Sequence, residues 1–413
     1  MPPSILSMLQ TAKRRIAQPW NRLRAARRME TFTQPRTAQS ICAGLAVLVL
    51  VAGVLGVPQS GSAAVVSDAH ALLEVCGKSP LGLVPCAQDK LEAVLLTKGS
   101  ESAYQILENA SAQDPAMEAE GHNVAHQLGR TSVSYYPTSK EALRHCPLTM
   151  ASGCFHGVLE RHFTNVGPPR QAGDLTQLCT QDDGANRYFQ CLHGLGHGLD
   201  MVAMHELPQA LAWCSLLSLN WTQDSCAGGV FMENIVADTS MEHHHGMAMP
   251  NMTWVRLKAD DLQYPCDAVS QRWWRDCYWL QSSAVLRLGK TMQDAFTACD
   301  AAPNGYQDVC YESMGRDISG TNHREASAIV NACMGGQFTL RGSCIYGAAQ
   351  EIVNNSGKTA PGFTFCSQVP LRQKTDCYRA MGAMVRNLAP TDRQRECQRS
   401  ESKYVQVCLK AAA

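Results

Sequence analysis

The sequence has few charged residues, no net charge, and none of the short motifs that identify common enzyme classes. Of its 413 residues only 17% are charged, and 36 basic residues balance 36 acidic ones. We find no HExxH, GxSxG, Walker A, dinucleotide-binding or CxxCH motif. These absences argue against the usual zinc proteases, serine hydrolases, nucleotide-binding enzymes and c-type cytochromes. The hydrophobic content of 45% excludes a disordered chain.

The balanced total conceals an uneven distribution of charge. Residues 1–40 carry eight basic residues against one acidic residue, Glu30, so the remainder of the chain is net acidic. Residues 41–57 contain no charged residue, and no later apolar run is as long. A basic flank followed by an apolar run of this length predicts a single membrane span with the N-terminus in the cytoplasm.

This N-terminal pattern has two interpretations. We predict an uncleaved signal anchor at residues 41–57 in the cytoplasmic membrane, with the C-terminal domain outside the cytoplasm. The alternative is a cleaved signal peptide, because small residues at 60–64 suit a peptidase, and the protein would then be secreted after cleavage near residues 60–65. The basic leader is explained by the positive-inside rule, so no nucleic-acid partner is expected.

The remaining chain is predicted to form one cysteine-rich region. The expected organisation is a cytoplasmic segment (1–40), the span (41–57), a linker (58–68), an N-terminal helical cap (69–118) and a cysteine-stapled helical repeat domain (119–413). A His/Met-rich insertion interrupts the repeat domain at residues 238–256.

The 19 cysteines occur mostly as short-spaced pairs. Cys42 lies in the apolar segment, and the other 18 follow it, in an oxidising compartment where disulfides persist. We predict bonds within these pairs: Cys76–Cys86, Cys146–Cys154, Cys179–Cys191, Cys214–Cys226, Cys266–Cys277, Cys299–Cys310, Cys333–Cys344, Cys366–Cys377 and Cys397–Cys408. The alternative joins the two ends of one helical hairpin, for example Cys191 with Cys214, and the sequence does not decide between them.

The cysteine pairs mark a repeat of about 31–35 residues. A helix-like run follows the second cysteine of a pair, often with a glycine in its first turn, and another ends at the next first cysteine, as at 139–146, 208–214 and 292–299. Such units predict an all-α fold, an α-solenoid of helix–turn–helix repeats stapled by disulfides. The plan resembles the cysteine-rich, Sel1-like class of stapled helical repeats over about residues 119–408. The resemblance concerns architecture and implies no activity.

Histidines recur at helical spacing in three consecutive repeats. Of the 13 histidines, 12 lie between residues 122 and 323. The i, i+4 pairs are His122 with His126, His156 with Glu160, and His193 with His197. Each pair projects from one helical face, and equivalent helices of a stack line one surface. We therefore predict a site for one or two transition metal ions (copper, iron or zinc), with His162 and Glu233 as additional ligands. The alternative is hydrogen bonding between packed helices.

A second metal-binding candidate lies in the His/Met-rich insertion. Its ligands would be Met241, His243, His244, His245, Met247, Met249 and Met252. Thioether and imidazole groups together favour copper, so we predict that this loop acquires or delivers copper. The alternative is a surface loop of accidental composition.

Together these features predict a membrane-anchored extracytoplasmic repeat protein with a His/Glu metal site, as in a copper- or iron-dependent redox enzyme, although catalysis itself is left open. The rival prediction is a non-catalytic scaffold whose solenoid face binds an envelope protein, peptide or glycan. The restriction of the histidine pairs to three consecutive repeats favours the metal site, because a scaffold would distribute polar residues along all repeats. Later repeats carry Trp279, Glu312, Tyr346 and Arg379 at the first position of the pair.

Overall fold

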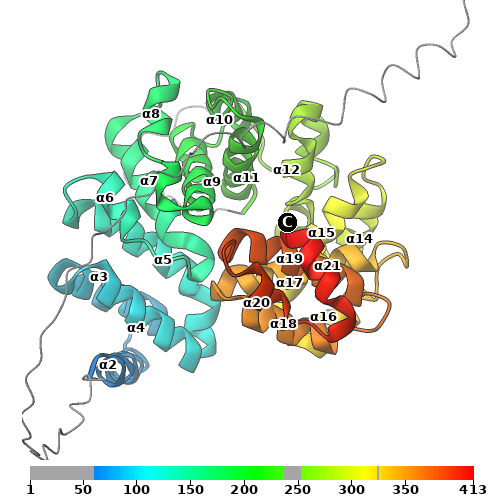
Figure 1. Cartoon of the computed structure of the whole chain (residues 1–413). Helices are drawn as coiled ribbons and strands as arrows, with labels where there is room; N and C mark the ends of the chain where they lie inside the picture. The colour runs from blue at the N-terminus through cyan, green and yellow to red at the C-terminus, as the bar shows by residue number, and fades with distance from the viewer. Residues whose placement is uncertain (1–59, 237–252, 323–324) are drawn as a thin grey trace, which may run out of the picture. The chain divides into compact units, whose positions relative to one another are not determined.

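The computed structural model describes residues 60–236, 253–322 and 325–413. These residues form helices joined by turns and contain no strand, so the all-α prediction is confirmed (Figure 1). The chain divides into Met1–Val57 and Pro58–Ala413, and the described residues belong to the second unit. None of their helices combines the length and the apolarity of a membrane span. The predicted span at residues 41–57 lies outside the described residues.

The helices before the His/Met-rich insertion are α2 (Ser60–Cys76), α3 (Leu83–Lys98), α4 (Ser100–Gln113), α5 (Pro115–Tyr135), α6 (Ser139–Arg144), α7 (Gly153–Val166), α8 (Ala172–Thr176), α9 (Ala185–Val202), α10 (Leu207–Cys214) and α11 (Asn220–Val236). Those after it are α12 (Trp274–Tyr278), α13 (Gln281–Arg287), α14 (Met292–Asp300), α15 (Gln307–Thr321), α16 (Ala326–Cys333), α17 (Arg341–Ser356), α18 (Thr359–Gln368), α19 (Lys374–Leu388), α20 (Arg393–Cys397) and α21 (Val405–Ala412). Short 3₁₀ turns are η2 (Met150–Ser152), η3 (Gln181–Asp183), η5 (Cys266–Ala268), η6 (Gln271–Trp273) and η7 (Ser402–Tyr404).

Two classes of helix alternate along the chain. We call α5, α7, α9, α11, α15, α17 and α19 the A helices, and the shorter α6, α8, α10, α14, α16, α18 and α20 the B helices. Consecutive A helices pack on each other, as α7, α9 and α11 do side by side in Figure 1. Helices α12 and α13 together take the A position between α11 and α15. Helical repeats are thus confirmed, while the α-solenoid as the path of the stack stays a prediction.

Disulfide bonds connect successive repeats, which confirms the prediction of disulfides. Each bond links the two members of one short-spaced pair, and in the part of the chain that the structure describes none closes a helical hairpin: Cys76–Cys86, Cys146–Cys154, Cys179–Cys191, Cys214–Cys226, Cys266–Cys277, Cys299–Cys310, Cys333–Cys344, Cys366–Cys377 and Cys397–Cys408. All of these cysteines are buried. The first bond joins α2 to α3, and most of the later bonds tie the end of a B helix, or the segment that follows it, to the next A helix.

The A helices begin earlier than the sequence predicts. Cys191, the second cysteine of its pair, lies inside α9 rather than before it, because the helix begins at Ala185. Gly184 precedes it with a φ of 89°, a conformation that favours glycine. The expectation that the helix follows the second cysteine is therefore wrong, and Cys191 bonds from within α9 to Cys179, which follows α8.

Glycines set the distance between neighbouring A helices. A Cβ atom on Gly157 of α7 would lie 1.8 Å from the carbonyl oxygen of His126 on α5. One on Gly229 of α11 would lie 1.9 Å from the carbonyl oxygen of His193 on α9. A side chain at either position would push the two backbones apart. The backbone of the neighbouring helix fills the space beside both glycines.

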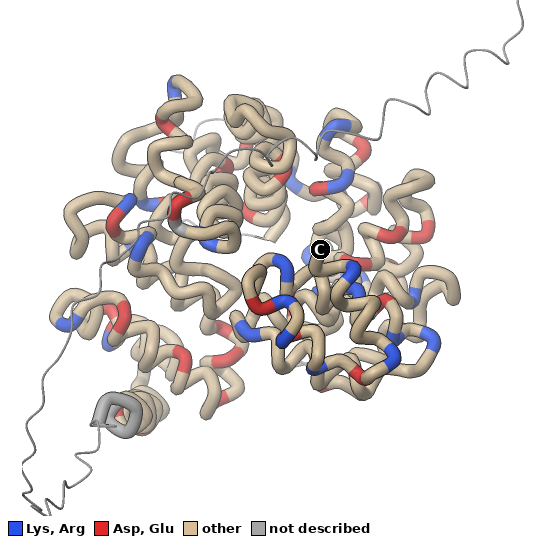
Figure 2. The backbone as a smooth tube through the Cα atoms, in the orientation of Figure 1, with Lys and Arg blue, Asp and Glu red and all other residues tan. Residues whose placement is uncertain are grey.

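Local sequence signals set where helices begin. At the start of α5, Asp114 accepts hydrogen bonds from the backbone N–H groups of Ala116 and Met117, and Pro115 is the first helical residue. This start fixes the register in which α5 presents its histidine pair to α7. Basic and acidic residues are interspersed over the described helices (Figure 2).

Candidate metal centre

The six residues of the three sequence pairs meet on one wall of a cavity. They are His122 and His126 from α5, His156 and Glu160 from α7, and His193 and His197 from α9. Three overlapping groups each offer three ligand atoms within 4.8 Å of one another: His122, His126 and His156; His156, His193 and His197; and His126, Glu160 and His197. These buried His/Glu groups could hold a metal ion. That they do so stays a prediction.

The ring orientations of His122 and His126 are fixed by oxygen acceptors. His122 Nδ1 lies 2.8 Å from the carbonyl oxygen of Met150, and His126 Nδ1 lies 2.7 Å from Glu160 Oε1. Since a carbonyl or carboxylate oxygen accepts, each Nδ1 carries the proton and donates. Wherever such a ring carries no second proton, its Nε2 atom presents a lone pair. Orienting contacts of this kind are typical of metal-ligating histidines.

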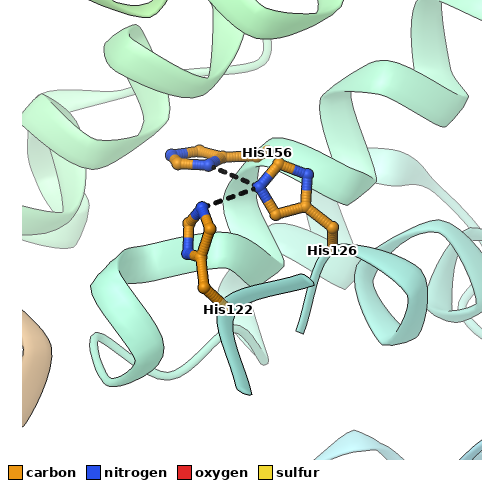
Figure 3. Close-up of side chains that lie close together, drawn as sticks. All are labelled: His122, His126 and His156. Carbon is orange, nitrogen blue, oxygen red and sulfur yellow. Dashed lines mark hydrogen bonds between the residues drawn. The ribbon is translucent and has the colours of Figure 1, made fainter. Parts of the chain in front are cut away.

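The free nitrogens of these rings converge with a nitrogen of His156. His126 Nε2 lies 3.0 Å from His122 Nε2 and 3.0 Å from His156 Nδ1, and Figure 3 shows it between the two other rings. A single proton on His126 Nε2 or His156 Nδ1 can satisfy only one of these contacts. A cation that accepts all three lone pairs would satisfy both. The arrangement thus has the donor set of a metal site.

The other half of the cluster contains two unpartnered nitrogens. The Nε2 atoms of His156 and His197 are buried and have no hydrogen-bond partner among the described residues. Their rings stack with centroids 3.9 Å apart, and the His193 ring centroid lies 5.2 Å from each. His197 Nδ1 lies 2.9 Å from Glu233 Oε2, within hydrogen-bond distance. Leaving buried polar atoms unsatisfied costs about 1–3 kcal/mol each, which a bound cation would offset.

Glu160 has both carboxylate oxygens engaged. Oε1 accepts from His126, and Oε2 pairs with Arg130 Nη1 at 2.5 Å. Burial raises the pKa of Glu160, but His126 and Arg130 lower it more, so the net pKa lies below its usual range. Glu160, predicted as a ligand, is thus placed to orient His126. Arg130 was not predicted, although it follows His126 by four residues and shares its helix face.

Burial keeps the remaining rings neutral at pH 7. It lowers the pKa of His122 to about 3, with His126 as the second cause, and that of His193 to about 4. Burial also lowers the pKa of His156 and His197 well below the usual range, and neighbouring histidines add to both shifts. Neutral imidazoles keep their lone pairs, which metal binding requires.

Glu233 completes the cluster from α11, near the place that the sequence predicts. Burial raises its pKa well above the usual range, and the nearby carboxylates of Glu160 and Asp200 raise it further. A cation bound in the cluster would oppose this shift and favour the ionised carboxylate. Because its Oε2 lies 2.9 Å from His197 Nδ1, Glu233 is better placed to hold His197 than to bind the ion directly.

A strained turn supplies the acceptor for His122. Met150, Ala151 and Ser152 in η2 all have positive φ angles, of 52°, 46° and 61°. Non-glycine residues rarely adopt this region, and such strain is concentrated at functional sites. The sequence could not reveal this turn, because none of these residue types favours a left-handed backbone.

Two further groups of predicted ligands stand apart from the cluster. His162 Nδ1 contacts Ser139 Oγ at 3.0 Å, and His162 belongs to none of the three groups of potential ligands among the described residues. The His/Met-rich ligands lie outside the described residues: Met241, His243, His244, His245, Met247, Met249 and Met252.

The cluster opens onto a cavity with a volume of about 1390 Å³. Trp279, Glu312 and Tyr346 line the same cavity, at repeat positions equivalent to His122. Arg316 also lines it, stacked 4.9 Å from the Trp279 ring and hydrogen-bonded to Asp317. The A helices thus present equivalent positions to one shared space, which a small substrate could enter beside the histidines.

Comparison of this chain with protein-family models, with curated proteins and with solved structures finds no match.

Proposed function

We propose that this chain is an extracytoplasmic metalloprotein whose histidine cluster binds a transition metal ion through His122, His126 and His156. One observation carries the proposal. His126 Nε2 lies 3.0 Å from a nitrogen of each of the other two rings. The Nδ1 atoms of His122 and His126 are bonded to oxygen acceptors. Their ring protons are therefore not available to form hydrogen bonds where the other ring nitrogens converge.

The spacing suits metal coordination. Two nitrogen ligands at about 2.0–2.1 Å from one ion, roughly at right angles, lie about 3 Å apart. Neutral imidazoles suit copper, iron and zinc. Because the cluster lines a cavity, a fourth position on the ion can take water or substrate, as catalytic rather than structural sites do. We favour a copper or iron ion that performs redox chemistry at that position.

The proposal includes the location of the protein. Residues 41–57 anchor the chain in the cytoplasmic membrane, and an α-solenoid of repeats follows outside the cytoplasm. The basic flank of residues 1–40 supports this orientation. Nine disulfides between short-spaced cysteines support an oxidising compartment. The His/Met-rich insertion would supply copper to the cluster.

Metal analysis of the purified full-length chain tests the proposal. The chain is loaded separately with copper, iron and zinc, dialysed, and assayed for bound metal. His243, His244 and His245 are changed to Ser in every sample, so that the insertion does not contribute imidazoles. His126→Ala should retain less metal than this parent, because it removes one of the three imidazoles that bind this ion. The matched control is His162→Ala on α7, whose side chain bonds to Ser139. Absence of bound metal from the parent after all three loadings would refute the proposal.

A further inference from the structure

His156 belongs to two of the three groups of potential ligands. It joins His122 and His126 in one, and His193 and His197 in the other. Its two ring nitrogens have different surroundings. Nδ1 faces His126 Nε2 at 3.0 Å, whereas Nε2 is buried without a hydrogen-bond partner in the described part of the chain. One ring therefore offers a nitrogen to each side of the cluster.

The second group repeats the ligand pattern of the first. His197 Nδ1 is hydrogen-bonded to Glu233, and its Nε2 is buried and unpartnered within the described structure. His193 makes a hydrogen bond to the backbone of Ser225. His193 and His197 each contact an oxygen through one ring nitrogen, as metal-ligating histidines do. The His156 and His197 rings stack at an interplanar angle of 12°, so one of the two rings must rotate before both can bind a single ion.

The third group is a weaker candidate for a separate ion. It requires Glu160, whose oxygens are both engaged, one by His126 and the other by Arg130. Coordination there would displace a buried ion pair and leave the Arg130 guanidinium without its partner carboxylate, which is costly. The group of His156, His193 and His197 needs no such displacement.

We propose that the cluster holds two metal ions bridged by the imidazolate ring of His156. The first ion binds His122, His126 and His156 Nδ1, and the second binds His156 Nε2, His193 and His197. The inference rests on the proposed function for the first position and adds the second. A neutral His156 carries one ring proton, which is released to solvent when both nitrogens bind cations. The resulting negative charge on the ring, with Glu160 and Glu233 beside the cluster, offsets the repulsion between the cations.

A bridge of this kind has a magnetic consequence that two separate sites lack. The ions would lie roughly 6 Å apart across the ring, since each metal–nitrogen bond is about 2 Å long. Two Cu(II) ions joined through one imidazolate couple antiferromagnetically, so their electron paramagnetic resonance (EPR) signal is weaker than that of two isolated ions.

The test uses Cu(II) alone as the probe, with the full-length chain in which His243, His244 and His245 are changed to Ser. We expect two copper ions per chain and an EPR intensity well below that of two isolated ions at low temperature. His197→Ala should bind one copper with the full intensity of one ion, and so should His122→Ala. His162→Ala, on the same helix as His156, should behave as the parent.

Two results on the parent would overturn the bridge while leaving the proposed function intact. One is a single bound copper ion, and the other is two copper ions with the intensity of two uncoupled ions. Absence of bound copper and of other transition metals would overturn the proposed function and the bridge together. Because these outcomes are read from the unaltered cluster, the test does not depend on the folding of any cluster variant.

Discussion

His122 and His126 face each other through Nε2 atoms 3.0 Å apart, and each ring donates its Nδ1 proton to an oxygen acceptor on another element. His126 is held by Glu160 on α7, and His122 by the strained Met150 turn. Both rings are thus oriented from outside their own helix. This preorganisation would allow a metal site whose ligands come from packed repeats rather than from one local motif.

Removing the carboxylate that orients His126 should weaken metal binding. Glu160→Gln keeps the side-chain size but loses the charge that His126 and Arg130 share. We expect metal affinity to fall by about 10–100-fold, the usual effect of losing an outer-shell partner. Competition titration against a chelator measures this. The matched control is Glu141→Gln on α6, which belongs to none of the groups of potential ligands among the described residues. An equal fall in both variants would rule out an orienting role for Glu160.

A methyl group at the contact between α5 and α7 should destabilise the fold. A Cβ on Gly157 would overlap the carbonyl oxygen of His126, so Gly157→Ala must separate the helices. Overpacking of this kind costs about 1–3 kcal/mol of unfolding free energy. Gly320→Ala in α15 is the control, because a Cβ there meets nothing within 4 Å. Alanine should stabilise that helix by about 1 kcal/mol. Equal denaturation midpoints for the two variants would contradict the close contact.

Loss of one disulfide should destabilise the repeat stack without removing its helices. The bond between Cys179 and Cys191 closes a separation of 12 residues. A loop of this size contributes about 3 kcal/mol on the chain-entropy account. The double variant Cys179→Ala, Cys191→Ala should therefore unfold at lower urea concentration, with a nearly unchanged far-ultraviolet circular dichroism spectrum. Peptide mapping of the parent without reduction should recover the two cysteines linked, and free thiols at both would contradict the structure.

Glu312 should make stability fall as pH rises. Burial raises the pKa of Glu312 to about 7, and Asp308 adds to the shift against Arg275 and Arg379. At pH values between the pKa of Glu312 in the unfolded chain and about 7, the folded chain binds more protons than the unfolded chain. The free energy of unfolding therefore falls as the pH rises through this range. Glu312→Gln removes that dependence. Its stability relative to the parent should increase by roughly 2–3 kcal/mol between about pH 5 and about pH 8.

Denaturation of parent and variant at both pH values measures this difference. Glu101→Gln, at an exposed position in α4, serves as the matched control for the loss of a carboxyl outside the cavity. A Glu312→Gln difference that is the same at both pH values would show that the carboxyl titrates normally.

The repeat made the grouping of the histidines predictable. His122, His156 and His193 occupy equivalent positions, and consecutive A helices pack in order, so the sequence period alone places these side chains on one wall. The short cysteine pairs likewise indicated the helix boundaries approximately. The true start of α9 depended on Gly184, whose left-handed backbone the cysteine spacing does not report.

The roles of individual residues could not be predicted in the same way. Glu160 has the spacing of a ligand, but its engagement with Arg130 depends on the distance between α5 and α7, which Gly157 sets through a backbone contact. The acceptor for His122 is a main-chain oxygen, so no residue type encodes it. The two three-histidine groups can be distinguished only from the ring orientation of His156, and a sequence period does not specify that orientation.

The most direct measurement is the anomalous X-ray signal of copper in crystals of the full-length chain, loaded with Cu(II) and washed free of excess metal. We predict an anomalous peak about 2 Å from His122 Nε2, His126 Nε2 and His156 Nδ1, the length of a metal–nitrogen bond. Crystals in which the cluster is ordered but shows no anomalous peak, with copper bound elsewhere or not at all, would contradict the metal centre.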